Sequence, residues 1–210
     1  MRLILMGAPG AGKGTQADIL SNVLKIPTIS TGNILRAAMK DGSELGKRVT
    51  DFMDAGRLVP DDIIIEIIHE RLAKEDCQNG YILDGVPRTV PQAEAMEKLG
   101  IVIDYAVSME VADETITQRM SGRRVCPDCG GSYHIMARPP KRSGLCDKCN
   151  ARLHQRTDDL PETVKNRLAI YHKATKPLED FYEARGLLRL TGEQVEVGAT
   201  TEAILRVIGR

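Results

Sequence analysis

Short apolar runs alternate with segments of helical periodicity along most of the chain. Residues 2–6 (RLILM) are typical of a buried parallel strand, and residues 16–24 then carry apolar positions at helical spacing. The same alternation predicts further strands at 26–30, 81–84, 101–108 and 187–190. It indicates an α/β protein with a doubly wound parallel sheet of about five strands, covered by helices on both faces. A ligand would lie at the carboxyl ends of these strands.

The region between the second and third strands contains more helical pattern than one crossover needs. Two short helices are predicted, one opened by the capping residues 30–33 (STGN) and one over 44–55. A strongly apolar helix, capped by Asp61 and Asp62, follows them. We therefore expect the first two helices to form a small insertion.

The second half of the chain contains three further predicted helices. Asp113 caps the first of them, and Pro161 opens the longest helical pattern, which runs to Tyr182. An amphipathic helix over 201–208 closes the chain.

A glycine-rich segment, residues 7–15 (GAPGAGKGT), separates the first strand from the first helix. Strand, glycine loop and helix in this order are typical of a phosphate-binding loop, in which backbone N–H groups surround phosphate oxygens. Lys13 would reach the β- and γ-phosphates of a nucleoside triphosphate. Gly14 departs from the strict pattern, since Ser or Thr usually follows the lysine and Thr15 comes one residue late. The alternative, an ordinary flexible turn, is disfavoured by the flanking strand and helix.

Asp84 ends the strand predicted at 81–84. An aspartate at the carboxyl end of a strand beside a phosphate loop is typical of one that directs Mg²⁺, although Asp-Gly is also a strong turn pair. Thr89 and Gln92 have the spacing of a capping box, so Gln92 could serve only to start a helix.

Four cysteines form two C-x2-C pairs separated by 16 residues: Cys126, Cys129, Cys146 and Cys149. This spacing predicts a structural zinc site with four thiolate ligands. Gly and Pro pairs between the cysteines predict loops, so a metal-held knuckle at 122–159 should project from the main domain. His134 is an alternative ligand, and Cys77 is left over as a small thiol.

The composition limits the classes of function. The 210 residues suit one α/β domain with insertions, and the 29 basic and 29 acidic residues balance. Neutral charge and scarce aromatic residues (two Phe, five Tyr, no Trp) disfavour nucleic-acid binding. No apolar run reaches membrane-spanning length, and the first one is too short for a signal peptide. We expect a cytoplasmic monomer.

Several motifs together resemble the adenylate kinase family: 7–16 (GAPGAGKGTQ), 30–36 (STGNILR) and 84–89 (DGVPRT). Residues 122–125 and 155–159 resemble the two ends of the family's mobile lid, and the four cysteines resemble those of its zinc-bearing bacterial members. The similarity covers almost the whole chain.

The resemblance implies reversible phosphoryl transfer from Mg-ATP to AMP, giving two ADP and serving adenine nucleotide homeostasis. It also implies a core of residues 1–29, 60–121 and 160–210, an AMP-binding flap at 30–59 and a zinc-binding lid at 122–159. The partners would be ATP, AMP and ADP, and the cofactors Mg²⁺ and a structural Zn²⁺.

The resemblance assigns residues to three overlapping sets. The ATP side comprises Gly10, Ala11, Gly12, Lys13, Gly14, Thr15, Arg119, Arg123 and Gln194. The AMP side comprises Thr31, Arg36, Gly85, Arg88, Gln92, Arg156 and Arg167. The catalytic set comprises Lys13, Asp84, Arg88, Arg123, Arg156 and Arg167. Phosphoryl transfer needs charge stabilisation rather than a protein nucleophile, and the guanidinium fork suits phosphate oxygens. Replacing Arg156 or Arg167 with Ala should lower turnover by orders of magnitude and barely affect folding, because we expect these arginines to be exposed charges.

Two residues depart from the family pattern: Asn33 stands where Asp is frequent, and Val86 where Phe is usual. Three other functions stay open at this point. They are a kinase for another nucleoside monophosphate, a nucleic-acid-binding protein that uses the zinc knuckle, and a nucleotide switch that hydrolyses its ligand slowly.

Overall fold

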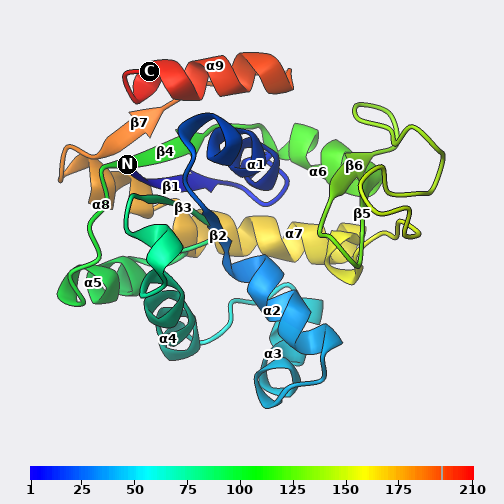
Figure 1. The fold of residues 1–210 in the computed structure, drawn as a ribbon, viewed down its shortest axis with the longest axis horizontal. Helices are drawn as coiled ribbons and strands as arrows, with labels where there is room; N and C mark the ends of the chain where they lie inside the picture. The colour runs from blue at the N-terminus through cyan, green and yellow to red at the C-terminus, as the bar shows by residue number, and fades with distance from the viewer. Residues whose placement is uncertain (195) are drawn as a thin grey trace.

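A five-stranded parallel sheet forms the centre of the computed structural model, which describes residues 1–194 and 196–210 (Figure 1). Its spatial order is β2-β3-β1-β4-β7. The strands are β1 (Arg2–Gly7), β2 (Thr28–Ser30), β3 (Tyr81–Asp84), β4 (Tyr105–Met109) and β7 (Leu188–Leu190). The register places Leu5 of β1 opposite Asp84 of β3, and Gly7 opposite Met109 of β4. The predicted doubly wound α/β fold is confirmed.

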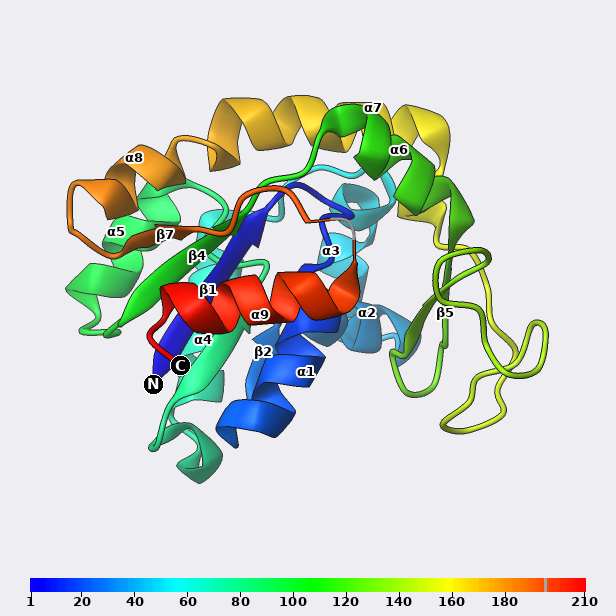
Figure 2. The same cartoon turned by 90° about the horizontal axis from the view of Figure 1, so that it is seen from above.

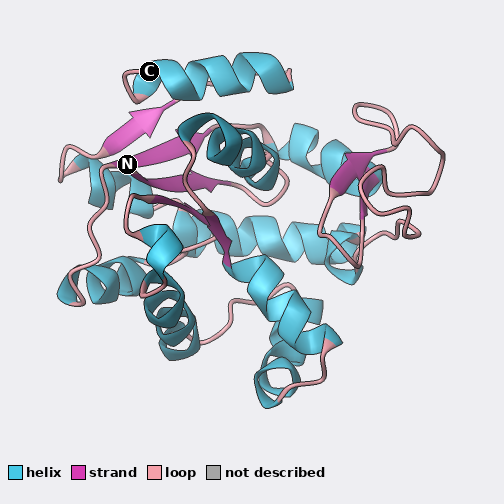
Figure 3. Ribbon diagram, viewed as in Figure 1, coloured by secondary structure: helices cyan, strands magenta, loops and turns pink. Residues whose placement is uncertain are grey.

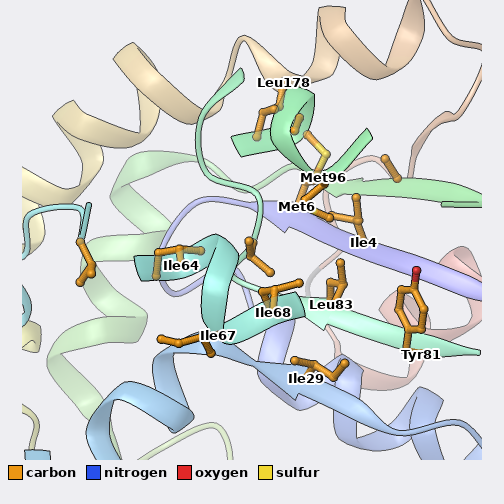
Figure 4. Close-up of a cluster of buried hydrophobic side chains, with 14 of the residues drawn as sticks. Ile4, Met6, Ile29, Ile64, Ile67, Ile68, Tyr81, Leu83, Met96 and Leu178 are labelled. Atoms are coloured by element: carbon orange, nitrogen blue, oxygen red, sulfur yellow. The ribbon is translucent and has the colours of Figure 1, made fainter. Parts of the chain in front are cut away.

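Two apolar clusters cover the two faces of the sheet, because successive side chains of a strand point to opposite faces. Ile4 and Met6 join the cluster formed with α4 (Asp61–Leu72), α5 (Val90–Lys98) and α8 (Leu178–Glu183), shown in Figure 4. Leu3 and Leu5 join the cluster formed with the remaining core helices. These are α1 (Lys13–Leu24), α6 (Asp113–Gly122), α7 (Pro161–Ile170) and α9 (Val197–Val207). Both Figure 1 and Figure 2 show α9 next to α1.

The predicted insertion consists of α2 (Thr31–Lys40) and α3 (Glu44–Asp54), which project away from the sheet (Figure 1). The two helices pack closely because Gly46 has no side chain. A Cβ atom at this position would lie 2.2 Å from the backbone oxygen of Ala38. Ser43 caps α3 by accepting a hydrogen bond from the Gly46 amide at 3.1 Å. A short 3₁₀ turn, η1 (Glu75–Cys77), follows α4.

The cysteine-containing segment forms a second projection, mostly of loops (Figure 3). It also contains a small antiparallel pair, β5 (Arg123–Val125) with β6 (Ser132–His134), and ends near the 3₁₀ turn η2 (Thr157–Asp159). The sequence pattern did not indicate these strands, since each spans only three residues and most of those residues are polar.

Several predicted boundaries were wrong. The strand expected at 101–108 begins only at Tyr105, and α9 begins at Val197 rather than at residue 201. The long helix predicted from Pro161 is interrupted by a π-helical stretch, η3 (Tyr171–Thr175), before α8. Pro177 follows this stretch, and proline lacks the N–H that a continuous helix needs. The helices expected to be capped by acidic residues begin with those residues in the first turn instead.

Candidate active site

The glycine-rich loop turns tightly between β1 and α1. Gly7, Gly10 and Gly12 have φ values of 137°, 87° and 102°, which residues with a side chain rarely adopt. A Cβ atom at Gly7 would also lie 2.6 Å from the Met109 oxygen. Lys13 folds back along the loop, and its Nζ donates to the backbone oxygens of Gly7 at 2.7 Å and Ala8 at 2.8 Å. The loop therefore has the predicted phosphate-binding shape.

One large cavity, about 400 Å³ in volume, opens at the carboxyl ends of the strands. Its walls come from the glycine loop, from α2, from the loop after β3 and from the cysteine-containing segment. Most of the predicted site residues line it: Gly10, Ala11, Gly12, Lys13, Gly14, Thr15, Arg36, Asp84, Gly85, Arg88, Arg119, Arg123, Arg156 and Arg167. Thr31, Gln92 and Gln194 do not line this cavity.

Arg123 and Arg167 are held by two acidic residues in η2. Arg123 forms a two-pronged ion pair with Asp159, whose side chain is fully buried. Arg167 donates to Asp158 Oδ2 at 2.7 Å and lies 3.5 Å from Asp159 Oδ1. The two arginine side chains are only 18% and 16% exposed. The expectation that these arginines are exposed was therefore wrong for this pair, and the reason for expecting little effect on folding no longer applies to them. Asp158 and Asp159 lay in the 155–159 motif, but no local pattern indicated that arginines would be their partners.

Arg156 lies in the same cavity without a comparable partner. Its Nε atom is buried and has no hydrogen-bond partner among the described residues. Desolvation by burial, together with the charges of Arg36 and Arg123, lowers its pKa from its ordinary value to about 9. The guanidinium nevertheless stays charged at neutral pH, so the cavity contains a positive group that an anion would stabilise.

Lys13 shows the same electrostatic strain. Burial is the main cause that lowers its pKa to about 7; the charge of Asp84 opposes this shift, and the charges of nearby arginines add to it. Burial also lowers the pKa of Arg36, of Arg88 and of Arg167, the last to about 10. A cavity that collects so many desolvated cations favours a polyanionic ligand.

Asp84 lies against the start of α1, where a Cβ atom on Gly14 would be 3.6 Å from its Oδ2. The same oxygen accepts a hydrogen bond from Ser30 Oγ at 3.1 Å. Asp84 is thus placed beside the phosphate loop. Within the described residues, its other oxygen, Oδ1, accepts no hydrogen bond from a side chain. A carboxylate in this position is suited to holding Mg²⁺ next to phosphate oxygens bound by the loop.

The loop after β3 lines the cavity beside the start of α2. Arg88 Nε donates to the Gly85 oxygen at 2.8 Å, and Thr31 Oγ1 donates to the same oxygen at 3.1 Å. On α2, Arg36 Nη2 donates to Asn33 Oδ1 at 2.8 Å. Val86 faces away, since it is 1% exposed and belongs to the apolar cluster under the sheet. Asn33 therefore has a contact that bears on the site, whereas Val86 contributes to packing.

Gln92 lies in a smaller cavity of about 20 Å³. Leu58, Gly85 and Arg88 line both cavities. Gln92 is 2% exposed and its amide is bonded at both ends, to the Arg88 amide and to Asp61. The capping interpretation holds in part. Thr89 Oγ1 accepts a hydrogen bond from the backbone N–H of Gln92, as in a capping box, but the side chain of Gln92 accepts from the backbone N–H of Arg88 rather than from that of Thr89. The sequence did not indicate Asp61 as a partner.

Two residues of α9, Val197 and Thr200, also line the large cavity. Arg119 lies 3.5 Å from the Ala11 oxygen and 3.4 Å from the Gln194 oxygen, so it connects the phosphate loop to the segment before α9. The residue after Gln194 lies outside the described residues. Gln16 Nε2 donates to the Val197 oxygen at 2.9 Å, and Thr201 Oγ1 donates to Gln16 Oε1 at 2.7 Å. Gln16 was missed because its partners lie more than 180 positions away.

The four predicted metal ligands come together. The Sγ atoms of Cys126, Cys129, Cys146 and Cys149 all lie within 4.8 Å of one another. A tetrahedral zinc with Zn–S bonds of about 2.3 Å needs sulfur atoms about 3.8 Å apart, and two of the pairs are at 3.3 and 3.4 Å. His134 Nδ1 accepts from the amides of Met136 and Ala137, and this histidine is outside the cluster. The cluster fits a structural zinc with four thiolates.

The cysteine-containing segment touches the helical insertion across the cavity. Lys40 Nζ lies 3.0 Å from Asp128 Oδ1, and Thr157 Oγ1 donates to Asp54 Oδ1 at 3.0 Å. Both contacts are exposed.

Helices of membrane-spanning length and apolarity are absent from the residues that the structure describes.

Comparison with known proteins identifies the family. The family model described as adenylate kinase matches residues 5–187. A protein named adenylate kinase from Caldicellulosiruptor bescii is 55% identical, over all of this chain and 99% of its own length. Adenylate kinases from Lachnoclostridium phytofermentans and Oceanobacillus iheyensis are 49% and 51% identical, over 100% and 92% of this chain and 99% and 93% of their own. A phosphate loop, an arginine-rich cavity and a four-cysteine segment agree with these matches, and the chain belongs to the adenylate kinase family of nucleoside monophosphate kinases.

Proposed function

We propose that this enzyme catalyses the reversible transfer of the terminal phosphoryl group of Mg-ATP to AMP, giving two ADP. The observation that carries the proposal is a single cavity lined by two sets of groups suited to binding phosphate. The glycine loop with Lys13 forms one, and Arg36 with Arg88 forms the other. A hydrolase would need only the first set, whereas a transfer between two phosphorylated substrates needs both.

The donor side would use the phosphate loop. Its backbone amides and Lys13 would bind the β- and γ-phosphates of ATP, and Arg119 and the backbone near Gln194 would bound the adenine. Mg²⁺, when bound, would neutralise charge on the phosphate oxygens, and Asp84 is the carboxylate placed to direct it. Lys13 would exchange its contacts with backbone oxygens for contacts with phosphate.

The acceptor side would use two guanidinium groups from different elements. Arg36 projects from α2 and Arg88 from the loop after β3, so they can bind the AMP phosphate from two sides. Thr31 and Gln92, beside the smaller cavity, would contact the adenine.

The remaining arginines would stabilise the group in transfer. Arg123 and Arg167 are held in place by η2, and Arg156 has a buried Nε available for a new acceptor. Charge stabilisation by one such arginine is worth about 10³–10⁵ in rate. The protein supplies no nucleophile, since the phosphate of AMP attacks directly and ADP leaves.

We further propose that residues 30–59 move as an AMP-binding flap and residues 122–159 as a lid, against a core of 1–29, 60–121 and 160–210. The contacts between Lys40 and Asp128 and between Thr157 and Asp54 would hold the two together when closed. Zinc would stabilise the lid and take no part in the reaction. The enzyme would act as a cytoplasmic monomer in adenine nucleotide homeostasis.

A coupled assay of ATP with AMP, GMP, IMP, UMP and CMP tests the proposal. We expect AMP to be the preferred acceptor by kcat/KM. Equal use of UMP or GMP would replace the proposal with the nearest alternative, a kinase for another nucleoside monophosphate. Hydrolysis of ATP without an acceptor requirement would indicate a nucleotide switch instead.

A further inference from the structure

The Gln92 amide is fixed at both ends by groups of opposite hydrogen-bonding character. Its Oε1 accepts from the backbone N–H of Arg88 at 2.7 Å, and its Nε2 donates to Asp61 Oδ1 at 2.7 Å. A backbone N–H can only donate, and an ionised carboxylate can only accept. The amide therefore has one stable orientation, and turning it over would oppose donor to donor and acceptor to acceptor.

Asp61 is itself held in this arrangement. Its second oxygen, Oδ2, accepts from Thr89 Oγ1 at 3.1 Å, and Thr89 caps the helix that carries Gln92. Asp61 is half-buried, at the start of α4, while its neighbour Asp62 is exposed. Of these two adjacent carboxylates, only Asp61 thus reaches the smaller cavity's glutamine.

The fixed amide still has unused hydrogen-bonding capacity. A glutamine amide has two N–H groups and two oxygen lone pairs, and the contacts with Asp61 and Arg88 use one of each. One donor and one acceptor remain, in a fixed order. The cavity beside them shares Leu58, Gly85 and Arg88 with the large cavity, so the two cavities adjoin at Arg88, the residue proposed to bind the AMP phosphate.

Purines differ in the order of donor and acceptor along the edge that carries position 6. Adenine has an amino donor at C6 and an acceptor at N1, while guanine and hypoxanthine have a carbonyl acceptor at C6 and a donor at N1. In one binding pose, an amide of fixed orientation can match only one of these two orders. An amide free to turn over would match both.

We propose that Asp61 is a specificity-determining positioning residue, which fixes the Gln92 amide so that the acceptor site distinguishes 6-aminopurine from 6-oxopurine nucleotides. This inference rests on the proposed function, since it assumes that the acceptor base lies beside Gln92. Asp61 acts through Gln92 and does not itself contact the substrate.

Three variants separate this role from structural alternatives. Asp61→Ala removes the acceptor, Asp61→Asn removes the charge but keeps an amide oxygen that can accept from Gln92, and Asp62→Ala is the matched control. Asp61 and Asp62 both lie in the first turn of α4, so the two alanine variants lose similar interactions with the helix dipole. The readout is kcat/KM for AMP relative to IMP, with KM for ATP measured alongside.

We expect Asp61→Ala to lower the preference for AMP over IMP about ten-fold or more, because an unsatisfied buried polar group typically costs about ten-fold to a hundred-fold in discrimination. The change should appear mainly as a lowered KM for IMP, because a freed amide can also match the 6-oxopurine edge, with the KM for ATP unchanged. Asp61→Asn should keep most of the preference, and Asp62→Ala should keep all of it. Unchanged selectivity in Asp61→Ala, or an equal loss in Asp61→Asn, would overturn the inference.

A measurement on the unaltered protein covers the case in which Asp61→Ala does not fold. In a ¹⁵N-labelled sample, the proton of the Gln92 side-chain N–H₂ group that is directed at Asp61 should exchange slowly with solvent and have a shift displaced from that of an exposed glutamine. Two resonances with solvent-like shifts and fast exchange would contradict a fixed amide. If the unaltered enzyme itself uses IMP as well as AMP, the proposed function fails, whatever the variants show.

Discussion

Replacing Arg156 with methionine should remove activity and stabilise the unliganded protein at the same time. The pKa of Arg156 falls well below its ordinary value, to about 9, through desolvation and the neighbouring charges of Arg36 and Arg123. One pKa unit corresponds to about 1.4 kcal/mol, so the charged guanidinium costs the folded state about 5 kcal/mol at most. Methionine keeps much of the apolar stem and removes the charge.

The measurable gain is smaller than this limit, because the side chain is partly exposed and relaxes toward water. We expect about 1–2 kcal/mol, which raises Tm by roughly 2–8 °C for a domain of this size. The loss of a cation that stabilises the transferred group should lower kcat by about 10³–10⁵. Increased stability together with lost turnover would show that the Arg156 charge destabilises the unliganded protein and is needed to stabilise a bound anion.

Thermal unfolding followed by circular dichroism, and the coupled kinase assay, measure the two quantities. Arg152→Met is the matched control, since Arg152 is an exposed arginine on the same projecting segment. It should leave both Tm and kcat unchanged. A variant at Arg156 that melts several degrees below the unaltered protein, or one that retains its turnover, would refute the electrostatic reasoning.

Three further predictions concern the ion pair, the phosphate-loop lysine and the metal. Arg123→Ala should destabilise the protein by about 3–5 kcal/mol in urea unfolding, because it leaves Asp159 buried without this partner, and the double variant with Asp159→Ala should recover part of the loss; equal stability of the single variant and the unaltered protein would contradict this. The pKa of Lys13 is about 7 in the unliganded enzyme, so ATP phosphates should raise it and binding at pH 8 should take up close to one proton. ATP affinity should then fall as pH rises from 7 towards 10, and calorimetry in two buffers of different ionisation enthalpy measures the uptake; a binding enthalpy independent of the buffer would exclude it. Removing zinc with a chelator should lower Tm while the core still binds ATP, since zinc binding in small modules is worth about 10–16 kcal/mol; purified protein with no zinc or iron near one ion per chain would contradict the metal assignment.

Two parts of the site, the glycine loop and the four-cysteine cluster, depend on residues at short, fixed spacings and could be predicted from the sequence. The glycine loop requires positive φ values at fixed positions, and a zinc site requires fixed cysteine spacing, so both leave a readable pattern. The partners of Gln16 and Gln92 lie 181 and 31 positions away in the chain. Such contacts depend on how the helices pack, and no local pattern encodes them. The pairing of Arg123 with Asp159 was hidden for the same reason, although both residues lay in motifs that were identified.

The hydrogen-bonded register of the sheet has a consequence for how the enzyme can change over evolution. Leu5, just before the phosphate loop, is paired with Asp84, just before the loop that carries Arg88. Neighbouring strands lie about 4.8 Å apart, and this spacing is set by backbone hydrogen bonds rather than by side chains. The strand spacing therefore sets the distance between the start of the proposed donor loop and the start of the proposed acceptor loop. Segments 30–59 and 122–159 lie outside this strand pairing. A change in their length, in their contacts with one another or in the metal ligands of segment 122–159 would therefore leave the distance between the starts of the two loops the same.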